Sequence, residues 1–197
     1  MKDWTGNTKS IYGIIAASNH SETEREVNDY YATDPQAIDF LLSSGAELSH
    51  NLWECACGEG HLSKRLLERG YDVRSTDLVY RGFGVGGVDF LSVYAPFDGD
   101  IITNPPYKYA KEFVEHALDI ITPGNNVFMF LKLQFLEGKG RKELYDRQEL
   151  KTVYISRSRI KCAKNGKFEE ISSSAVAYGW FQFQKGYIGD PVIKWIN

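Results

Sequence analysis

Apolar residues recur with two different periods along the chain, and the two periods alternate. Segments with apolar residues three or four positions apart predict amphipathic helices, while short apolar or alternating runs predict strands. Pro35 suits the first turn of one such helix, and Gly45 ends it. The predicted helices span about residues 35–44, 58–70, 108–121 and 139–149, and the predicted strands span about 51–57, 71–78, 100–103, 127–133, 151–160 and 174–185.

The alternation of strands and helices predicts a parallel sheet that helices cover on both faces. The last two β segments enclose Asn165 and Gly166, a dipeptide that favours a tight hairpin turn. We therefore expect a Rossmann-like α/β fold with an antiparallel terminal hairpin near one edge of the sheet.

The length of the chain favours one domain. The sequence has 197 residues, of which 43% are hydrophobic, enough for one substantial core. Residues 1–28 are polar and predict an arm or a flexible tail, so we expect a single domain over residues 29–197. The apolar runs are shorter than the roughly 20 residues that cross a bilayer, and the N-terminus is too polar for a signal peptide. We expect a soluble, cytoplasmic protein without a membrane partner.

Cysteine content argues against a disulfide framework and against a metal site. Cys55, Cys57 and Cys162 make an odd number in a chain with no export signal. No second pair of cysteines or histidines has the spacing of metal ligands. We therefore expect no bound metal.

The overall charge gives no sign of a nucleic-acid partner. Lys and Arg total 23 against 26 Asp and Glu, a net charge of −3. A nucleic acid would have to bind a local patch. Basic residues crowd the predicted hairpin and could contact phosphates, although a solvated turn is an equally good interpretation. They are Arg157, Arg159, Lys161, Lys164 and Lys167, and Lys139, Arg141 and Lys142 after the 127–133 strand extend the same pattern.

A glycine turn and an acidic residue follow the first two strands of the predicted sheet, where ligands of open α/β sheets bind. Gly58 and Gly60 allow close approach of a ligand to the backbone, and Asp77, 19 residues after Gly58, can accept the hydroxyls of a ribose. The third glycine of a dinucleotide-binding fingerprint is missing, so the turn does not favour binding of a pyrophosphate group. Asp89 can accept a hydrogen bond from an adenine amino group beside the ring of Phe90. An ordinary strand-helix turn and a core phenylalanine are the alternative interpretations.

The tetrapeptide Asn104-Pro105-Pro106-Tyr107 directly follows an apolar strand. Two prolines lack N–H donors and hold the chain extended, so they leave a stiff row of backbone carbonyls. The Asn104 side-chain oxygen and the Pro105 carbonyl can each accept one N–H of a planar amine and so localise the lone pair on its nitrogen. Tyr107 offers a ring on which a flipped base can stack. A simple strand-ending turn is the alternative for the isolated motif.

Together these motifs resemble the class I S-adenosylmethionine-dependent methyltransferases that carry an (Asp/Asn/Ser)-Pro-Pro-(Tyr/Phe/Trp) motif, and more closely the small DNA N6-adenine methyltransferases of phages and prophages. The resemblance covers about residues 29–185 and includes a Tyr-x-Thr-x-Pro segment at Tyr31 to Pro35. It implies a mostly parallel, seven-stranded sheet, S-adenosylmethionine as the cofactor and catalysis by Asn104, Pro105, Pro106 and Tyr107. The cofactor-binding residues that it implies are Tyr31, Thr33, Glu54, Ala56, Gly58, Gly60, Asp77, Leu78, Asp89, Phe90 and Asn104.

The same motif also occurs in methyltransferases that act on RNA or on protein glutamine. It therefore predicts amino-group methylation more firmly than it predicts DNA as the substrate. We expect no separate target-recognition domain beyond the hairpin and the arm. A cofactor-binding subunit without activity is a third hypothesis, against which the intact Asn104 motif argues.

Overall fold

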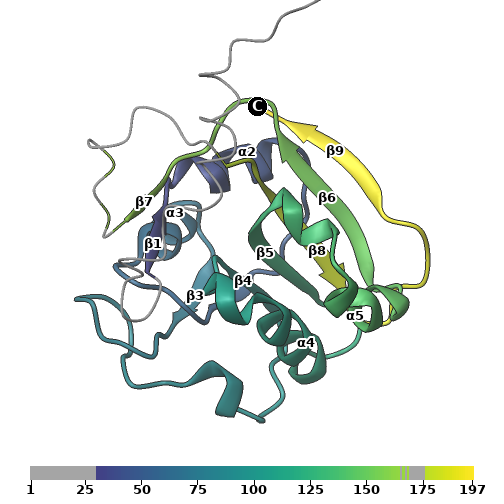
Figure 1. Cartoon of the computed structure of the whole chain (residues 1–197). Coiled ribbons are helices and arrows are strands. Elements are labelled where there is room, and N and C mark those ends of the chain that lie inside the picture. Colours follow the sequence, from purple (N-terminus) through teal and green to yellow (C-terminus); the bar gives the residue numbers. More distant parts are fainter. Residues whose placement is uncertain (1–29, 165, 167, 169–175) are drawn as a thin grey trace, which may run out of the picture.

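The computed structural model describes residues 30–164, 166, 168 and 176–197, so the predicted N-terminal arm lies outside the described residues. It contains two sheets and the helices that flank them (Figure 1). The strands are β1 (Tyr31–Thr33), β2 (Asn51–Glu54), β3 (Asp72–Ser75), β4 (Asp100–Thr103), β5 (Asn126–Lys132), β6 (Leu150–Ser156), β7 (Cys162–Lys164), β8 (Tyr178–Gln184) and β9 (Val192–Ile196). The helices are α2 (Gln36–Ser43), α3 (His61–Glu68), α4 (Ala110–Ile120) and α5 (Lys142–Asp146).

Seven strands form the main sheet, in the order β3-β2-β4-β5-β8-β6-β9. Strand β8 is antiparallel to both of its neighbours, β5 and β6, and all the other neighbouring pairs are parallel. Six of the seven strands therefore point the same way, and β8 alone opposes them. The predicted sheet, mostly parallel with an antiparallel hairpin of β6 and β8, is confirmed.

Each face of the main sheet has its own hydrophobic core. Ile101 of β4 packs in one core with Val114 of α4. The next residue, Ile102, packs in the other core with Ile38 of α2 and Leu66 of α3. Successive strand residues point to opposite faces, so the apolar central strands contribute to both cores. Helices therefore cover both faces, as the alternation of strands and helices predicted.

The small second sheet was not predicted. It pairs β1 with β7 in antiparallel fashion, with Tyr31 opposite Lys164 and Thr33 opposite Cys162. Both strands have only three residues, too few to show a period of two, and their pairing joins segments far apart in the sequence. The sheet lies beside α2 and α3 (Figure 1).

Strand β9 was also not predicted, and several predicted elements are shorter than expected. Strand β2 ends at Glu54 and β3 ends at Ser75, because the chain turns there toward the glycine segment and Asp77. The predicted helix 139–149 is reduced to a 3₁₀ turn, Lys139–Arg141, followed by α5. No helix in the described part of the chain combines the length and the apolar character that crossing a membrane would require.

Candidate active site

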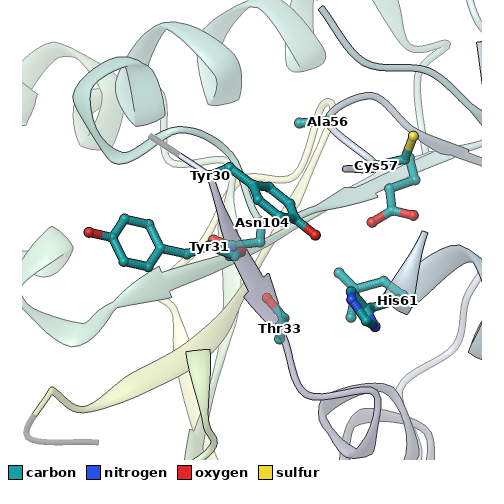
Figure 2. Close-up of a pocket in the computed structure, with 9 residues that line it drawn as sticks. Tyr30, Tyr31, Thr33, Ala56, Cys57, His61 and Asn104 are labelled. Atoms are coloured by element: carbon teal, nitrogen blue, oxygen red, sulfur yellow. The ribbon is translucent and has the colours of Figure 1, made fainter. Parts of the chain in front are cut away.

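A pocket lies where β1 meets the carboxyl ends of β2 and β4 (Figure 2). Ligands of open α/β sheets bind at this edge, because loops there leave room between the strand ends. The residues that line the pocket are Tyr30, Tyr31, Thr33, Glu54, Ala56, Cys57, His61, Leu62 and Asn104. Five of them, Tyr31, Thr33, Glu54, Ala56 and Asn104, were predicted from the sequence to bind a cofactor. The fold brings these five together, and their individual roles remain predictions.

The glycine turn after β2 is tied to Asp77 at the end of β3. Gly58 and Gly60 have positive φ angles of 54° and 78°, a conformation that side chains disfavour. The Gly58 N–H donates to Asp77 Oδ2 at 2.8 Å, and the Val79 N–H donates to Asp77 Oδ1 at 2.9 Å. Asp77 therefore holds the turn in shape, and the predicted ribose contact would use the remaining lone pairs of the same carboxylate.

Two aromatic rings lie against this glycine turn. A Cβ atom at Gly58 would come within 2.2 Å of the Tyr30 ring, and one at Gly60 would come within 2.2 Å of the Phe83 ring. The Tyr30 hydroxyl accepts a hydrogen bond from the Glu59 N–H at 3.3 Å and points into the pocket (Figure 2). Sequence reasoning missed both rings, because their contacts depend on segments that only the fold brings to the turn.

Glu54 is a buried carboxyl group in the wall of the pocket. Its Oε2 accepts a hydrogen bond from the Ser63 N–H at 2.8 Å and another from the Ser63 hydroxyl, which lies 2.6 Å from the Ser75 hydroxyl. Burial raises the pKa of Glu54 to about 8; the two hydrogen bonds from Ser63 act in the opposite direction, and the nearby charge of Asp77 raises it further. The carboxyl group is therefore poised to change its charge near neutral pH.

The side-chain amide of Asn104 has a fixed orientation. Its Nδ2 donates to the backbone carbonyl of Tyr31 at 3.0 Å, and this bond assigns which end of the amide is nitrogen. Its Oδ1 is buried and has no hydrogen-bond partner among the described residues. Because an unpaired buried acceptor is costly, Oδ1 is ready to accept a hydrogen bond from a ligand. The following residue, Pro105, is buried.

Tyr107 is surrounded by other side chains. Its ring stacks on Tyr178 with centroids 6.1 Å apart and lies 5.8 Å from the ring of Tyr31. The ammonium group of Lys132 lies 4.5 Å from the Tyr107 ring centroid. Burial raises the pKa of the Tyr107 hydroxyl well above its ordinary value, and Cys162 and Tyr178 next to it act in the same direction. Stacking of a base on this ring remains a prediction and would require these neighbours to shift.

Six of the eleven predicted cofactor-binding residues do not line the pocket: Gly58, Gly60 and Asp77 form the turn described above, and Leu78, Asp89 and Phe90 follow it in the chain. Leu78 is exposed. Asp89 caps a 3₁₀ turn, Phe90–Ser92, and accepts hydrogen bonds from the Leu91 N–H at 3.1 Å and from the Ser92 hydroxyl at 2.9 Å. Phe90 is buried and packs edge-on against Trp53, so its ring is part of the core. The proposed adenine contact therefore has its acceptor at the surface and its ring in the interior.

The predicted basic patch is only partly described. Arg157 follows β6 and donates to the backbone oxygen of Asn197 at 3.2 Å. Arg159 is exposed and Lys161 is half-buried. The side chain of Lys164 and all of Lys167 lie outside the described residues.

Two of the three cations that extend this patch after β5 are bonded within their own segment, and the third, Lys139, is exposed. Arg141 donates to the carbonyls of Phe135 at 2.8 Å and Gln134 at 3.2 Å, and Lys142 pairs with Asp146. These two cations therefore hold their own segment together. Among the described residues, no group of three His, Cys, Asp or Glu side chains is placed to hold a metal ion.

Comparison with protein-family profiles gives no match, and comparison with curated proteins gives none either. Comparison with solved structures gives many. A Listeria monocytogenes protein described as a class I S-adenosylmethionine-dependent methyltransferase has a TM-score of 0.59 at 12% identity, covering 92% of this chain and 70% of that one. A Pyrococcus horikoshii protein described as an RNA methyltransferase has a TM-score of 0.55 at 15% identity, covering 92% and 99%. The M protein of the type I restriction enzyme EcoKI has a TM-score of 0.56 at 14% identity, covering 93% and 48%.

These likenesses extend over more than nine-tenths of the chain. The chain therefore has the fold of the class I S-adenosylmethionine-dependent methyltransferases.

Proposed function

We propose that this protein transfers a methyl group from S-adenosylmethionine to an exocyclic amino group, and that its substrate is N6 of adenine in DNA. The observation that carries the proposal is the buried, unpartnered Oδ1 of Asn104, which a hydrogen bond to Tyr31 holds in place. An oriented acceptor beside the backbone of a Pro-Pro pair is suited to bind an amine with two N–H groups.

The residues of the motif prepare the amine for attack. Asn104 Oδ1 and the Pro105 carbonyl each accept one N–H, which draws the planar nitrogen toward tetrahedral geometry and localises its lone pair. The amide of Asn104 is already oriented, so little reorganisation opposes this binding. The nitrogen becomes acidic once methylated and positively charged, so it can lose its proton to water without a strong base.

The residues of the pocket fit the cofactor chemically. Glu54 places a buried carboxyl group in the pocket wall, whose ionised form would pair with a cationic group, and Asp77 at the glycine turn offers a carboxylate for ribose hydroxyls. When bound, S-adenosylmethionine supplies a methyl group on a positively charged sulfur. The sulfur is the leaving group and keeps the electron pair of the carbon–sulfur bond. The Tyr30 ring lies against Gly58, so it covers part of the glycine turn.

DNA is the favoured substrate for two reasons. The segment from Tyr31 to Pro35 and the terminal hairpin resemble those of small DNA adenine methyltransferases, and a restriction-modification M protein shares the fold. Arg159 and Lys161 follow β6 at the same edge of the sheet as Asn104, because β6 runs parallel to β4 and β5. A strand of nucleic acid lying along this edge would meet both cations and the motif.

The proposal is tested by incubating the purified protein with methyl-labelled S-adenosylmethionine and with DNA, RNA and protein separately, followed by mass spectrometry of nucleosides and peptides. The expected product is N6-methyladenine in DNA, lost with Asn104→Ala. The matched control is Asn125→Ala, because Asn125 bonds to Thr122 in a turn near the opposite edge of the sheet. Label in RNA or in glutamine instead would overturn the assignment to DNA. Cofactor binding without transfer to any of the three would show a subunit without activity.

A further inference from the structure

Lys132 is the last residue of β5, and it extends beyond the end of the neighbouring strand. Thr103, the last residue of β4, pairs with Met129. Lys132 therefore lies three residues further out, roughly 10 Å at 3.3 Å per residue. Its ammonium group lies 4.5 Å from the ring centroid of Tyr107. The cation thus lies beside Tyr107, the last residue of the candidate catalytic motif, at the edge of the sheet where β4 and β5 end.

The charge of Lys132 has no carboxylate within ion-pair distance among the described residues. Among the described lysines, Lys111 lies 3.6 Å from Glu115 and Lys142 pairs with Asp146, whereas others, Lys151 among them, resemble Lys132 in having no carboxylate within this distance. Lys132 is nevertheless half-buried, so fewer water molecules can solvate it than at an exposed position. The contact with Tyr107 engages the ammonium group with a ring face only, and its three N–H donors can still bind an anion.

A nucleotide carries a phosphate on each side of its sugar, so a base held at Asn104 brings a phosphodiester to within one nucleotide of the motif. The compact charge of a lysine suits such a phosphate better than it suits the patterned edge of a base. We propose that Lys132 binds the phosphodiester next to the target adenine and so positions the extruded nucleotide over Asn104. This proposal rests on the proposed function, and it adds a contact between the protein and the backbone of the nucleic-acid substrate.

A purely structural role for Lys132 predicts different behaviour. If the cation served only to hold the Tyr107 ring, its loss would lower stability or turnover without regard to the charge of any phosphate. A phosphate-binding role instead predicts that neutralising Lys132 and neutralising one phosphate are alternative ways of removing the same interaction.

The experiment is a double-mutant cycle between the protein and the DNA. The affinity of wild type and of Lys132→Gln is measured by fluorescence anisotropy, with S-adenosylhomocysteine present, for adenine-containing oligonucleotides that carry a single neutral methylphosphonate at each position in turn. The matched control is Lys151→Gln, because Lys151 lies near the start of β6, at the opposite edge of the sheet, and donates to Gln184 at 3.0 Å. A further variant, Lys132→Arg, keeps the charge.

We expect Lys132→Gln to weaken binding about tenfold and to reduce the slope of log affinity against log salt by about 0.7 to 0.9. We expect one methylphosphonate beside the target adenine to cost wild type a similar factor and to cost Lys132→Gln nothing. Lys151→Gln and Lys132→Arg should keep the wild-type slope. An equal methylphosphonate cost in wild type and Lys132→Gln at every position would overturn the phosphate contact.

The same oligonucleotides, incubated with S-adenosylmethionine in place of S-adenosylhomocysteine, separate this proposal from the proposed function. Coupling between Lys132 and one phosphate, without methyl transfer to that oligonucleotide, would support the phosphate site and reject adenine methylation. Methylation of the oligonucleotide without any coupling would support adenine methylation and reject the phosphate site at Lys132. No binding of wild type to any oligonucleotide would overturn both. Thermal unfolding of each variant checks that a loss of binding is not a loss of folding.

Discussion

Asn104 donates its side-chain amide to the backbone carbonyl of Tyr31 at 3.0 Å, across 73 positions of sequence. The bond joins the candidate catalytic motif to β1, the strand that runs into the candidate cofactor pocket (Figure 2). The orientation of the Asn104 side-chain oxygen therefore depends on the small β1·β7 sheet as well as on the main sheet.

This arrangement predicts that Asn104→Ala lowers kcat far more than it lowers cofactor affinity. Loss of one oriented hydrogen-bonding group in an active site costs about 10² to 10³ in rate. Single-turnover kinetics with DNA and calorimetric titration with S-adenosylmethionine measure the two effects separately. A large loss of cofactor affinity with unchanged kcat would contradict the role given to Asn104.

Asp77→Ala is expected to show the reverse pattern, with weak cofactor binding and a loss of stability. The substitution leaves the N–H groups of Gly58 and Val79 without their present acceptor, and an unpaired group costs about 1–3 kcal/mol where it is buried. Asp77→Asn keeps one oxygen acceptor and should retain part of both properties. Calorimetry and urea unfolding provide the measurements, and a cofactor affinity equal to wild type in Asp77→Ala would reject the role of this carboxylate.

The raised pKa of Glu54 predicts a specific pH dependence of stability. The folded protein holds the Glu54 proton up to about pH 8, whereas the unfolded chain releases it near the ordinary pKa of 4.5. The folded state therefore binds more protons between these values, so this group's contribution to the free energy of unfolding is complete below about pH 4.5 and is lost as the pH rises to about 8.

Glu54→Gln removes this titration while it keeps an oxygen for the donors of Ser63. The free energy of unfolding of Glu54→Gln, measured with urea at a series of pH values, should fall less than that of wild type across the same window. Parallel pH profiles for the two proteins would show that Glu54 is ionised throughout.

The Tyr30 ring over the glycine turn predicts a steric effect that a second substitution relieves. Gly58→Ala should lower the Tm and weaken cofactor binding, because a Cβ there would come within 2.2 Å of Tyr30 at a φ of 54°. In a Tyr30→Ala background the clash is absent and only the backbone strain remains, about 1 kcal/mol. Gly70→Ala is the matched control, since it also has positive φ but no atom within 4 Å of the added Cβ. Additive effects of the two substitutions would exclude the contact.

Charge reversal of Arg159 and Lys161 tests whether DNA lies along the end of β6. The pair Arg159→Glu and Lys161→Glu should weaken DNA binding and flatten its salt dependence. Arg157 is less informative, because its guanidinium already donates to Asn197. Lys151→Glu near the opposite edge should have little effect, and equal losses from both edges would indicate an unspecific effect of net charge.

The elements that the sequence predicted well are those whose signals are local. Helix and strand periods located the central strands and the helices on both faces, and the Asn104 motif and the glycine turn stood directly after strands. The second sheet escaped prediction because Thr33 and Cys162 pair across most of the chain. The contacts of Tyr30 and Phe83 with the glycine turn were not predicted for the same reason, because they also join segments that are separated in the sequence. No local pattern tells a ligand-binding phenylalanine from a core phenylalanine such as Phe90.

The reversed direction of β8 determines where the protein can vary. Because β6 ends and β8 begins at the same edge of the sheet as Asn104, the connecting segment 157–177 departs from that edge and comes back to it. Residues added or removed beyond β7 would change the length of this connection while Ile160 keeps its place in the hydrophobic core that α2 and α3 cover. Changes in the connection between β6 and β8 could thus alter which target is preferred. Exchanging this connection between proteins of different specificity would show whether the preference moves with it.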